Sequence, residues 1–116
     1  MALTRISNDT LQDATITQAK LGTEFTTSTA MAALDLDFSL AQIFTKTIAG
    51  NSTFTFSNVQ VGMVKDLILT GGGAATLTFP AGTKLAAGTY DGALSNLIQI
   101  LVAGAGNYWL TISQPQ

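Results

Sequence analysis

Hydrophobic and polar positions alternate along residues 36–59. Phe54 and Phe56 are separated and flanked by threonine and serine, the period-2 pattern of a strand with one face toward water. The preceding segment, Ile43–Ile48, is β-branched and aromatic and predicts a second strand. Residues 49–52 lie between them and include Gly and Asn, which tolerate positive φ. The pattern therefore predicts a β-hairpin over residues 43–57.

Similar short segments with turn signals between them continue to the end of the chain. We predict strands at 34–39, 43–48, 53–57, 64–70, 75–79, 94–102 and 108–113. Such spacing is typical of an all-β domain, here an antiparallel sandwich, jelly roll or small barrel over residues 30–116. Residues 71–73 are three glycines and predict a hairpin loop, and residues 104–107 predict a turn before the last strand. The segment 94–105 is the most apolar and predicts a strand buried on both faces, one of them against another subunit.

The first 29 residues differ from the rest and predict an extended or partly helical N-terminal arm. Its apolar residues are isolated among polar ones and are the candidate partner-binding positions: Leu3, Ile6, Leu11, Ile16 and Leu21. One interpretation is a weakly structured arm, anchored by Ile16 and Leu21, that becomes ordered against a partner or a neighbouring subunit. The other is a short helix with Asp13 near its start and Gly22 as its C-cap, packed on its own domain.

Composition points to an assembly subunit. Only 10% of the 116 residues are charged while 47% are hydrophobic, against roughly 25% charged in a typical soluble domain. No apolar run approaches the roughly 20 residues of a transmembrane helix, so we expect no membrane partner and apolar surface buried between subunits instead. The five basic residues are dispersed singly, which argues against nucleic-acid binding.

The side chains needed for most catalysis and metal binding are absent. The chain has no histidine and no cysteine, so we expect no enzyme activity, no cofactor and no metal site. Asp35 and Asp37 share a strand face and could form an acid/base pair or bind calcium, but charges that discourage strand addition are the simpler interpretation. Tyr90, in a glycine-flanked loop, is the candidate ligand contact. The side chains expected in the core are Phe38, Phe44, Phe54, Phe56 and Phe79.

Two phrases of the chain resemble bacteriophage proteins. The stretch DFSLAQIFTKTIAGNSTFTFSNVQVG (residues 37–62) resembles a module of small phage virion proteins, found in head decorations and in fibre or tail-fibre tips. In that module a glycine-rich hairpin and a closing aromatic strand follow, so that the resemblance covers residues 35–112. The phrase DATITQAKL (residues 13–21) resembles one common in the N-terminal segments of phage fibre proteins.

The resemblance implies a structural virion protein rather than a reaction. We expect a homotrimeric capsid decoration protein, a cement protein or head-fibre knob, whose arm (residues 1–29) binds the major capsid protein. The N-terminus lacks the apolar region of a signal peptide, so we expect synthesis in the host cytoplasm and residence on the virion surface. The alternative is a receptor-binding module of a fibre or tail that recognises a host surface glycan near Tyr90. A glycan hydrolase built on Asp35 and Asp37 is a third hypothesis.

Overall fold

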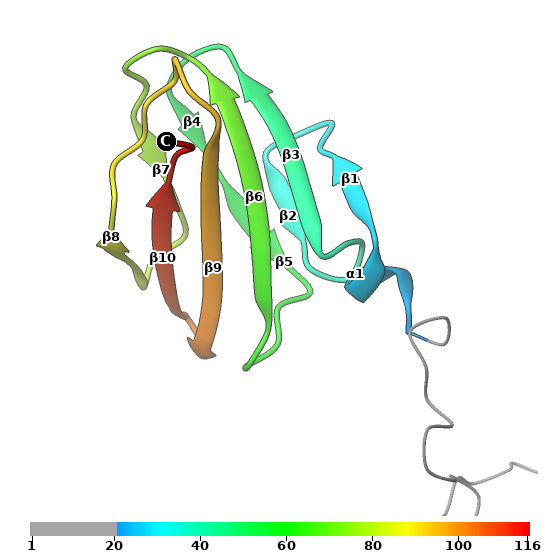
Figure 1. The fold of residues 1–116 in the computed structure, drawn as a ribbon. Coiled ribbons are helices and arrows are strands. Elements are labelled where there is room, and N and C mark those ends of the chain that lie inside the picture. Colours follow the sequence, from blue (N-terminus) through cyan, green and yellow to red (C-terminus); the bar gives the residue numbers. More distant parts are fainter. Residues whose placement is uncertain (1–20) are drawn as a thin grey trace, which may run out of the picture.

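The computed structural model describes residues 21–116, which fold mainly into β-strands (Figure 1). One short helix, α1 (Thr23–Thr26), precedes them. The strands, in chain order, are β1 (Ser28–Ala30), β2 (Asp35–Asp37), β3 (Ile43–Ile48), β4 (Ser52–Thr53), β5 (Thr55–Ser57), β6 (Val64–Gly71), β7 (Leu77–Thr78), β8 (Thr83–Ala87), β9 (Asn96–Gly104) and β10 (Asn107–Ser113). The prediction of an all-β fold is confirmed.

Six of the strands form one mixed sheet in the order β1-β3-β6-β9-β10-β8. β9 is antiparallel to both of its neighbours, β6 and β10. The pairs β1–β3, β3–β6 and β10–β8 are parallel. Two shorter parallel ladders, β2–β5 and β4–β7, lie behind this sheet in Figure 1. The domain therefore has two layers with the core between them.

The chain winds through these layers in two successive turns. β2, β3 and β4 form the first turn, and each pairs in parallel with its counterpart in the second turn, β5, β6 and β7. This stacking is solenoid-like, since each strand binds the strand one turn later. The predicted sandwich or jelly roll is therefore wrong, because the pairs among β2 to β7 are parallel. The predicted antiparallel pairing is present only where β9 lies between β6 and β10, and the predicted strands themselves are largely present.

The predicted hairpin over residues 43–57 is the clearest error. β3 pairs with β1 and β6, and neither β4 nor β5 folds back onto it. The segment between β3 and β4 turns a corner of the solenoid instead. There the Asn51 side-chain oxygen accepts a hydrogen bond from the Thr76 amide at 2.8 Å, and Ser52 Oγ donates to the Gly50 carbonyl at 2.9 Å. Asn51 thus joins two successive turns of the solenoid. The sequence does not reveal this role, because glycine and asparagine also suit a hairpin turn.

The predictions for the two glycine-rich segments, residues 71–73 and 104–107, had different outcomes. β7 pairs with β4 and not with β6, so the hairpin predicted at residues 71–73 is wrong. β9 and β10 pair antiparallel, so the predicted turn at residues 104–107 is confirmed. β8, which is rich in alanine and lies parallel to β10, was not predicted from the sequence. Gly88, which follows β8, has φ of +87°, and a Cβ there would overlap the Ile112 carbonyl oxygen of β10, so the close approach of these strands requires glycine.

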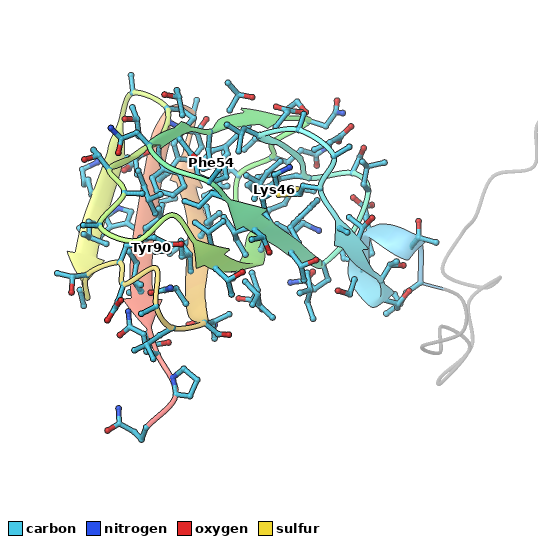
Figure 2. The ribbon with its side chains drawn as sticks, turned by 90° about the horizontal axis from the view of Figure 1, so that it is seen from above. Lys46, Phe54 and Tyr90 are labelled. Atoms are coloured by element: carbon cyan, nitrogen blue, oxygen red, sulfur yellow. The ribbon has the colours of Figure 1, made fainter. Side chains whose placement is uncertain are left out.

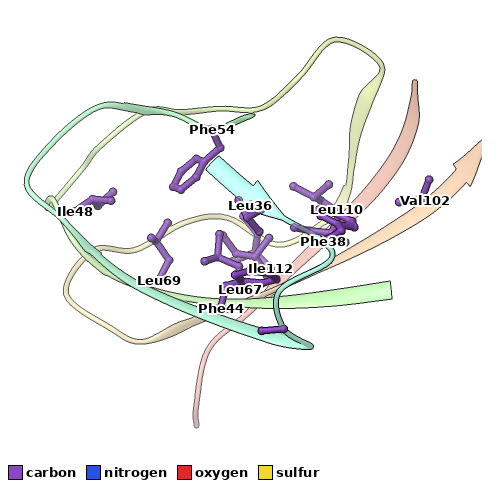
Figure 3. Close-up of a cluster of buried hydrophobic side chains, with 13 residues drawn as sticks. Leu36, Phe38, Phe44, Ile48, Phe54, Leu67, Leu69, Val102, Leu110 and Ile112 are labelled. Atoms are coloured by element: carbon purple, nitrogen blue, oxygen red, sulfur yellow. The ribbon is translucent and has the colours of Figure 1, made fainter. Parts of the chain in front are cut away.

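The core lies between the two layers (Figure 3). It contains thirteen buried apolar residues: Leu36, Phe38, Ala41, Phe44, Ile48, Phe54, Leu67, Leu69, Ile98, Ile100, Val102, Leu110 and Ile112. Phe56 and Phe79 are half-buried and pack against this cluster, so the prediction that these two and Phe38, Phe44 and Phe54 belong to the core is confirmed. The rings of Phe54 and Phe79 stack with their centroids 5.2 Å apart, and because they follow the opposed pair Thr53 and Thr78, this contact ties the two turns together.

The N-terminal boundary predicted between residues 29 and 30 falls inside β1. Ser28, Thr29 and Ala30 pair in parallel with β3 and form an edge of the six-stranded sheet. Gly22, expected as the C-cap of an earlier helix, instead occupies the N-cap position of α1. The part of the predicted arm that the structure describes is therefore packed on the β domain.

Candidate functional site

The most distinctive surface is the side of the six-stranded sheet that faces away from the core, which is the side seen in Figure 1. We call it the outer face. Burial alternates along β3, β6, β9 and β10, so every second side chain belongs to this face. Its members are Ile43, Thr45, Thr47, Val64, Asp66, Ile68, Thr70, Leu97, Gln99, Leu101, Ala103, Trp109, Thr111 and Ser113. Residues 96–104 are buried on the face toward the core. Gln99 and Leu101 on the other face are exposed in the single chain, so the predicted burial of that face against another subunit stays a prediction.

Strand register arranges the outer face in rows. Val64 lies opposite Leu101, which lies opposite Trp109. Leu101 is 42% exposed and Trp109 44%, and these three side chains form an apolar row across β6, β9 and β10. Ile68 and Leu97 form a second apolar pair nearer the other end of the same strands. The outer face therefore presents ordered apolar side chains to its surroundings.

A polar pair separates the two apolar rows. Asp66 of β6 lies opposite Gln99 of β9, and its neighbour on the other side is Ile43 of β3. Asp66 is the one charged residue among the outer-face members named above. Its Oδ1 atom is buried and has no hydrogen-bond partner among the described residues. A buried carboxylate oxygen without a donor is costly, so this position has an unmet requirement for a donor.

Tyr90 lies on the opposite side of the sheet, beside an apolar groove (Figure 2). The groove has a volume of about 260 Å³ between β7, β8 and β10, and its lining includes Leu77, Phe79, Leu85 and Tyr90. The Tyr90 ring is half-buried, and its hydroxyl donates to the Gly71 carbonyl oxygen at 2.7 Å. Burial, and to a lesser extent the charge of Asp91, raises the pKa of Tyr90. With its hydroxyl engaged, Tyr90 contributes to the lining of an apolar groove; its role as a ligand contact stays a prediction.

Asp35 and Asp37 belong to a polar ladder along β2 and β5. Their carboxylates accept hydrogen bonds from neighbouring side chains: Asp35 from Thr55 Oγ1 (2.7 Å) and Ser57 Oγ (2.7 Å), Asp37 from Ser39 Oγ (2.6 Å) and Asn58 Nδ2 (2.8 Å). The bonds from Ser39 and then Asn58 hold the pKa of Asp37 below its ordinary value. Thr55 and Ser57 are the register partners of the two aspartates. The pair therefore binds one solenoid turn to the next at the surface of the β2–β5 ladder.

The N-terminal candidates are only partly within the described chain. Leu21 is 45% exposed, next to α1, while Leu3, Ile6, Leu11 and Ile16 lie outside the described residues. α1 is held by Lys65, whose Nζ donates to the Glu24 carbonyl oxygen at 2.7 Å and lies 5.4 Å from the Phe25 ring centroid. Lys65 is only 1% exposed, and this burial lowers its pKa, an effect that the Glu24 carboxylate partly offsets. Sequence reasoning missed this buried lysine, since a lone lysine in a strand looks like a surface residue.

Residues 21–116 contain no cluster of three or more acidic side chains placed to hold a metal ion. Within the same residues no helix is long and apolar enough to cross a membrane. The features that could contact a partner are the outer face, the Tyr90 groove and the region around Leu21. Comparison of the chain with protein-family models, curated proteins and solved structures found no match.

Proposed function

We propose that this protein is a structural subunit of a bacteriophage virion: a homotrimer that decorates the capsid and binds the major capsid protein through its N-terminal arm. The resemblance over residues 35–112 supports the virion context. The observation that carries the proposal is the outer face, where apolar side chains stand exposed in register with a single charge among them. Such ordered apolar surface is typical of a protein that buries it against other subunits.

The chemistry of the described residues supports a structural rather than a catalytic role. The chain has neither histidine nor cysteine, and both candidate carboxylates are engaged by neighbouring hydroxyl and amide groups. A hydrolase using two carboxylates needs them to face a common open site. Asp35 and Asp37 already accept hydrogen bonds from their neighbours along the ladder between β2 and β5, which favours a structural role for the pair over the hydrolase hypothesis.

The test is binding of the full chain to empty capsid shells of the phage that encodes it, followed by co-sedimentation. The wild-type protein is expected to sediment with shells and to have a solution mass three times its 12.0 kDa chain mass. A variant with serine at Leu3, Ile6, Leu11 and Ile16 should keep that mass and lose shell binding. Unchanged binding by this variant would contradict the role of the arm, and absence of binding by wild-type protein would contradict capsid decoration.

The receptor-binding alternative is tested on the same preparations with an array of bacterial surface glycans. The apolar lining of the groove and the engaged Tyr90 hydroxyl suit an apolar group better than a sugar. We therefore expect no glycan to bind in a manner that depends on Tyr90. Glycan binding that Tyr90→Ala abolishes while the solution mass is unchanged would instead favour the receptor-binding module.

A further inference from the structure

We propose that residues 14–17 of one copy of this chain add as a strand to the open edge of β7 in a neighbouring copy, with Ile16 entering the Tyr90 groove. The inference rests on the proposed homotrimer. It assigns one stretch of the arm to a site on the next subunit and leaves residues 1–13 for the capsid shell. Residues 14–17 precede the described part of the chain. Three observations lead to the site: the open edge of β7, the sequence of residues 14–17 and the reach of the chain.

The first observation is that one edge of β7 has no strand beside it. β7 pairs with β4, and the Phe54 amide donates to the Thr78 carbonyl oxygen at 2.8 Å on that side. Because successive residues of a strand direct their backbone groups to opposite edges, the Leu77 N–H and C=O point to the other edge. No strand of residues 21–116 occupies that edge. Unpaired edge groups of this kind are a template for a further strand.

The open edge borders the Tyr90 groove. Leu77 lines the groove from β7, and Leu85, which is 55% exposed, lines it from β8. The back layer, formed by the ladders β2–β5 and β4–β7, is two strands wide, whereas the six-stranded sheet continues past it through β9, β10 and β8. A strand added to β7 therefore widens the back layer over the groove, and its inward side chains cover Leu77 and Leu85.

The second observation is that residues 14–17 repeat the sequence of β7. They read ATIT, while residues 75–78, which include β7, read ATLT. The match ends at the next position, where Gln18 stands in place of the half-buried Phe79. Within the match, apolar side chains alternate with threonine, which is the pattern of a strand with one face toward a core. Residues 14–17 therefore suit a place in the back layer beside β7.

A parallel addition gives the matched residues the same surroundings as those of β7. In the ladder of β4 and β7, Thr53 lies opposite Thr78, and both side chains are exposed. One further parallel step places Thr17 beside Thr78 at the surface. Ile16 then lies beside Leu77 and points into the groove, because register partners belong to the same face of a ladder.

The third observation is that this segment cannot reach the groove of its own chain. Leu21 precedes α1 and β1, and β1 is the first strand in the order of the six-stranded sheet, whereas β8 is the last. Five strand spacings of roughly 4.8 Å separate these two edges. Figure 2 shows α1 and the labelled Tyr90 at opposite ends of the domain. The four residues from Thr17 to Leu21 extend at most about 14 Å, so the occupant of the groove is residues 14–17 of another copy.

The first experiment uses engineered cysteines, because the chain has none of its own. Thr17→Cys combined with Thr78→Cys places two thiols at adjacent register positions, within the roughly 4.4–6.8 Å between Cα atoms that a disulfide requires. We expect mild oxidation to give covalent trimers on non-reducing gels, whereas either single variant links at most two chains. Thr17→Cys with Thr53→Cys is the matched control. Thr53 is also exposed but lies two strand spacings, roughly 9.6 Å, from Thr17, so no covalent trimer is expected.

Four outcomes would overturn the inference, and they separate it from the proposed function. Absence of covalent trimers in a protein whose solution mass is that of a trimer would leave the homotrimer intact. A disulfide within one chain would place residues 14–17 on their own domain. Covalent trimers through Thr53→Cys would assign the arm to the edge of β4. A monomeric solution mass without any linkage would overturn the homotrimer as well.

The second experiment tests whether the added strand covers the groove. In the background of Thr17→Cys and Thr78→Cys, Leu85→Glu places a charge under the added strand and should slow disulfide formation by about tenfold or more. Leu40→Glu is the matched control, because Leu40 is 56% exposed and lies outside the groove lining. We expect the control to form covalent trimers at the rate of the parent protein. An unchanged rate in Leu85→Glu would overturn the placement of Ile16 in the groove.

Discussion

The two faces of the six-stranded sheet are built from the same strands and have opposite fates. Toward the inside, the side chains of β3, β6, β9 and β10 are almost fully buried under the ladders β2–β5 and β4–β7. Toward the outside, side chains of similar apolar character, such as Ile68 and Leu101, stay exposed. The difference teaches that alternation along a strand decides which face of the sheet a side chain belongs to. Whether that face is buried depends on whether a second layer of strands covers it. The inner face therefore stabilises the chain, and the outer face is available for assembly.

Adjacent residues of β3 give the sharpest test of this difference. Phe44 is 1% exposed and points inward, while Thr45 points outward. Phe44→Ala is expected to lower the free energy of unfolding by about 3–5 kcal/mol through lost burial and a cavity, and Thr45→Ala by less than about 0.5 kcal/mol. Urea unfolding followed by tryptophan fluorescence measures both. Comparable losses for the two variants would mean that the outer face is as important to the fold as the inner face.

A second test concerns a buried polar residue on the inner face. Asn96 is fully buried, and its amide nitrogen lies within 3.2 Å of three carbonyl oxygens, those of Leu69, Asp91 and Leu94. Asn96→Leu leaves these buried groups without a donor and is expected to lower the free energy of unfolding by about 2–4 kcal/mol. The matched control is Gln99→Leu on the outer face of β9, measured as dissociated monomer, where little change is expected. A neutral Asn96→Leu would show that apolar packing alone fixes this end of β9.

A smaller loss of stability is expected from a change at Tyr90, beside the apolar groove. Tyr90→Phe removes the hydrogen bond to the Gly71 carbonyl and should lower the free energy of unfolding by about 1 kcal/mol at neutral pH. Because the pKa of Tyr90 is raised in the fold, the wild-type protein should also lose stability as pH rises beyond the ordinary value of 10.0, and the variant should lose less. Tyr108→Phe is the control. Parallel alkaline losses in the wild-type and Tyr90→Phe proteins would contradict this role.

The last test uses the pH dependence of the buried lysine. The pKa of Lys65 is lowered in the fold, so between that value and the ordinary 10.5 the unfolded chain binds the proton more tightly. The free energy of unfolding should therefore rise as pH increases toward 10. Lys65→Met should flatten this slope, whereas Lys84→Met, at an exposed position, should not. Chemical unfolding at several pH values between 7 and 10 measures the slope, and an unchanged slope in Lys65→Met would assign the effect to other groups.

The sequence predicted strands better than it predicted their partners. The β-branched run Ile43–Ile48 is observed over the same residues, because side-chain preference for a pleated, half-buried surface is local. Pairing is not local. The glycine and asparagine between β3 and β4 are equally suited to a hairpin and to a solenoid corner, and only the contact between Asn51 and Thr76 of the next turn distinguishes them. β8 was missed because its own side chains do not hold it in place. It is held by pairing with β10 and by the close approach that the glycines at its ends allow.

The candidate sites divide in the same way. From the composition we expected apolar surface that would be buried between subunits. The outer face is where apolar side chains are exposed in the single chain. The pairing of Asp66 with Gln99, and the Asp66 oxygen without a donor, could not be predicted, since they arise from register between β6 and β9. Tyr90 was singled out as an aromatic in a loop, but its hydroxyl is directed to the Gly71 carbonyl far away in sequence.

By itself, the sequence determined that the chain is built of short strands, which side chains share a strand face, and that few charges are available to cover the surface. These properties depend on neighbouring residues and on composition. The tertiary structure alone decided that the strands stack in parallel turns, that Lys65 is buried under α1, and that one face of the sheet stays uncovered. Those outcomes depend on contacts between residues distant in the chain, where many pairings satisfy the same local pattern and only the complete packing selects one.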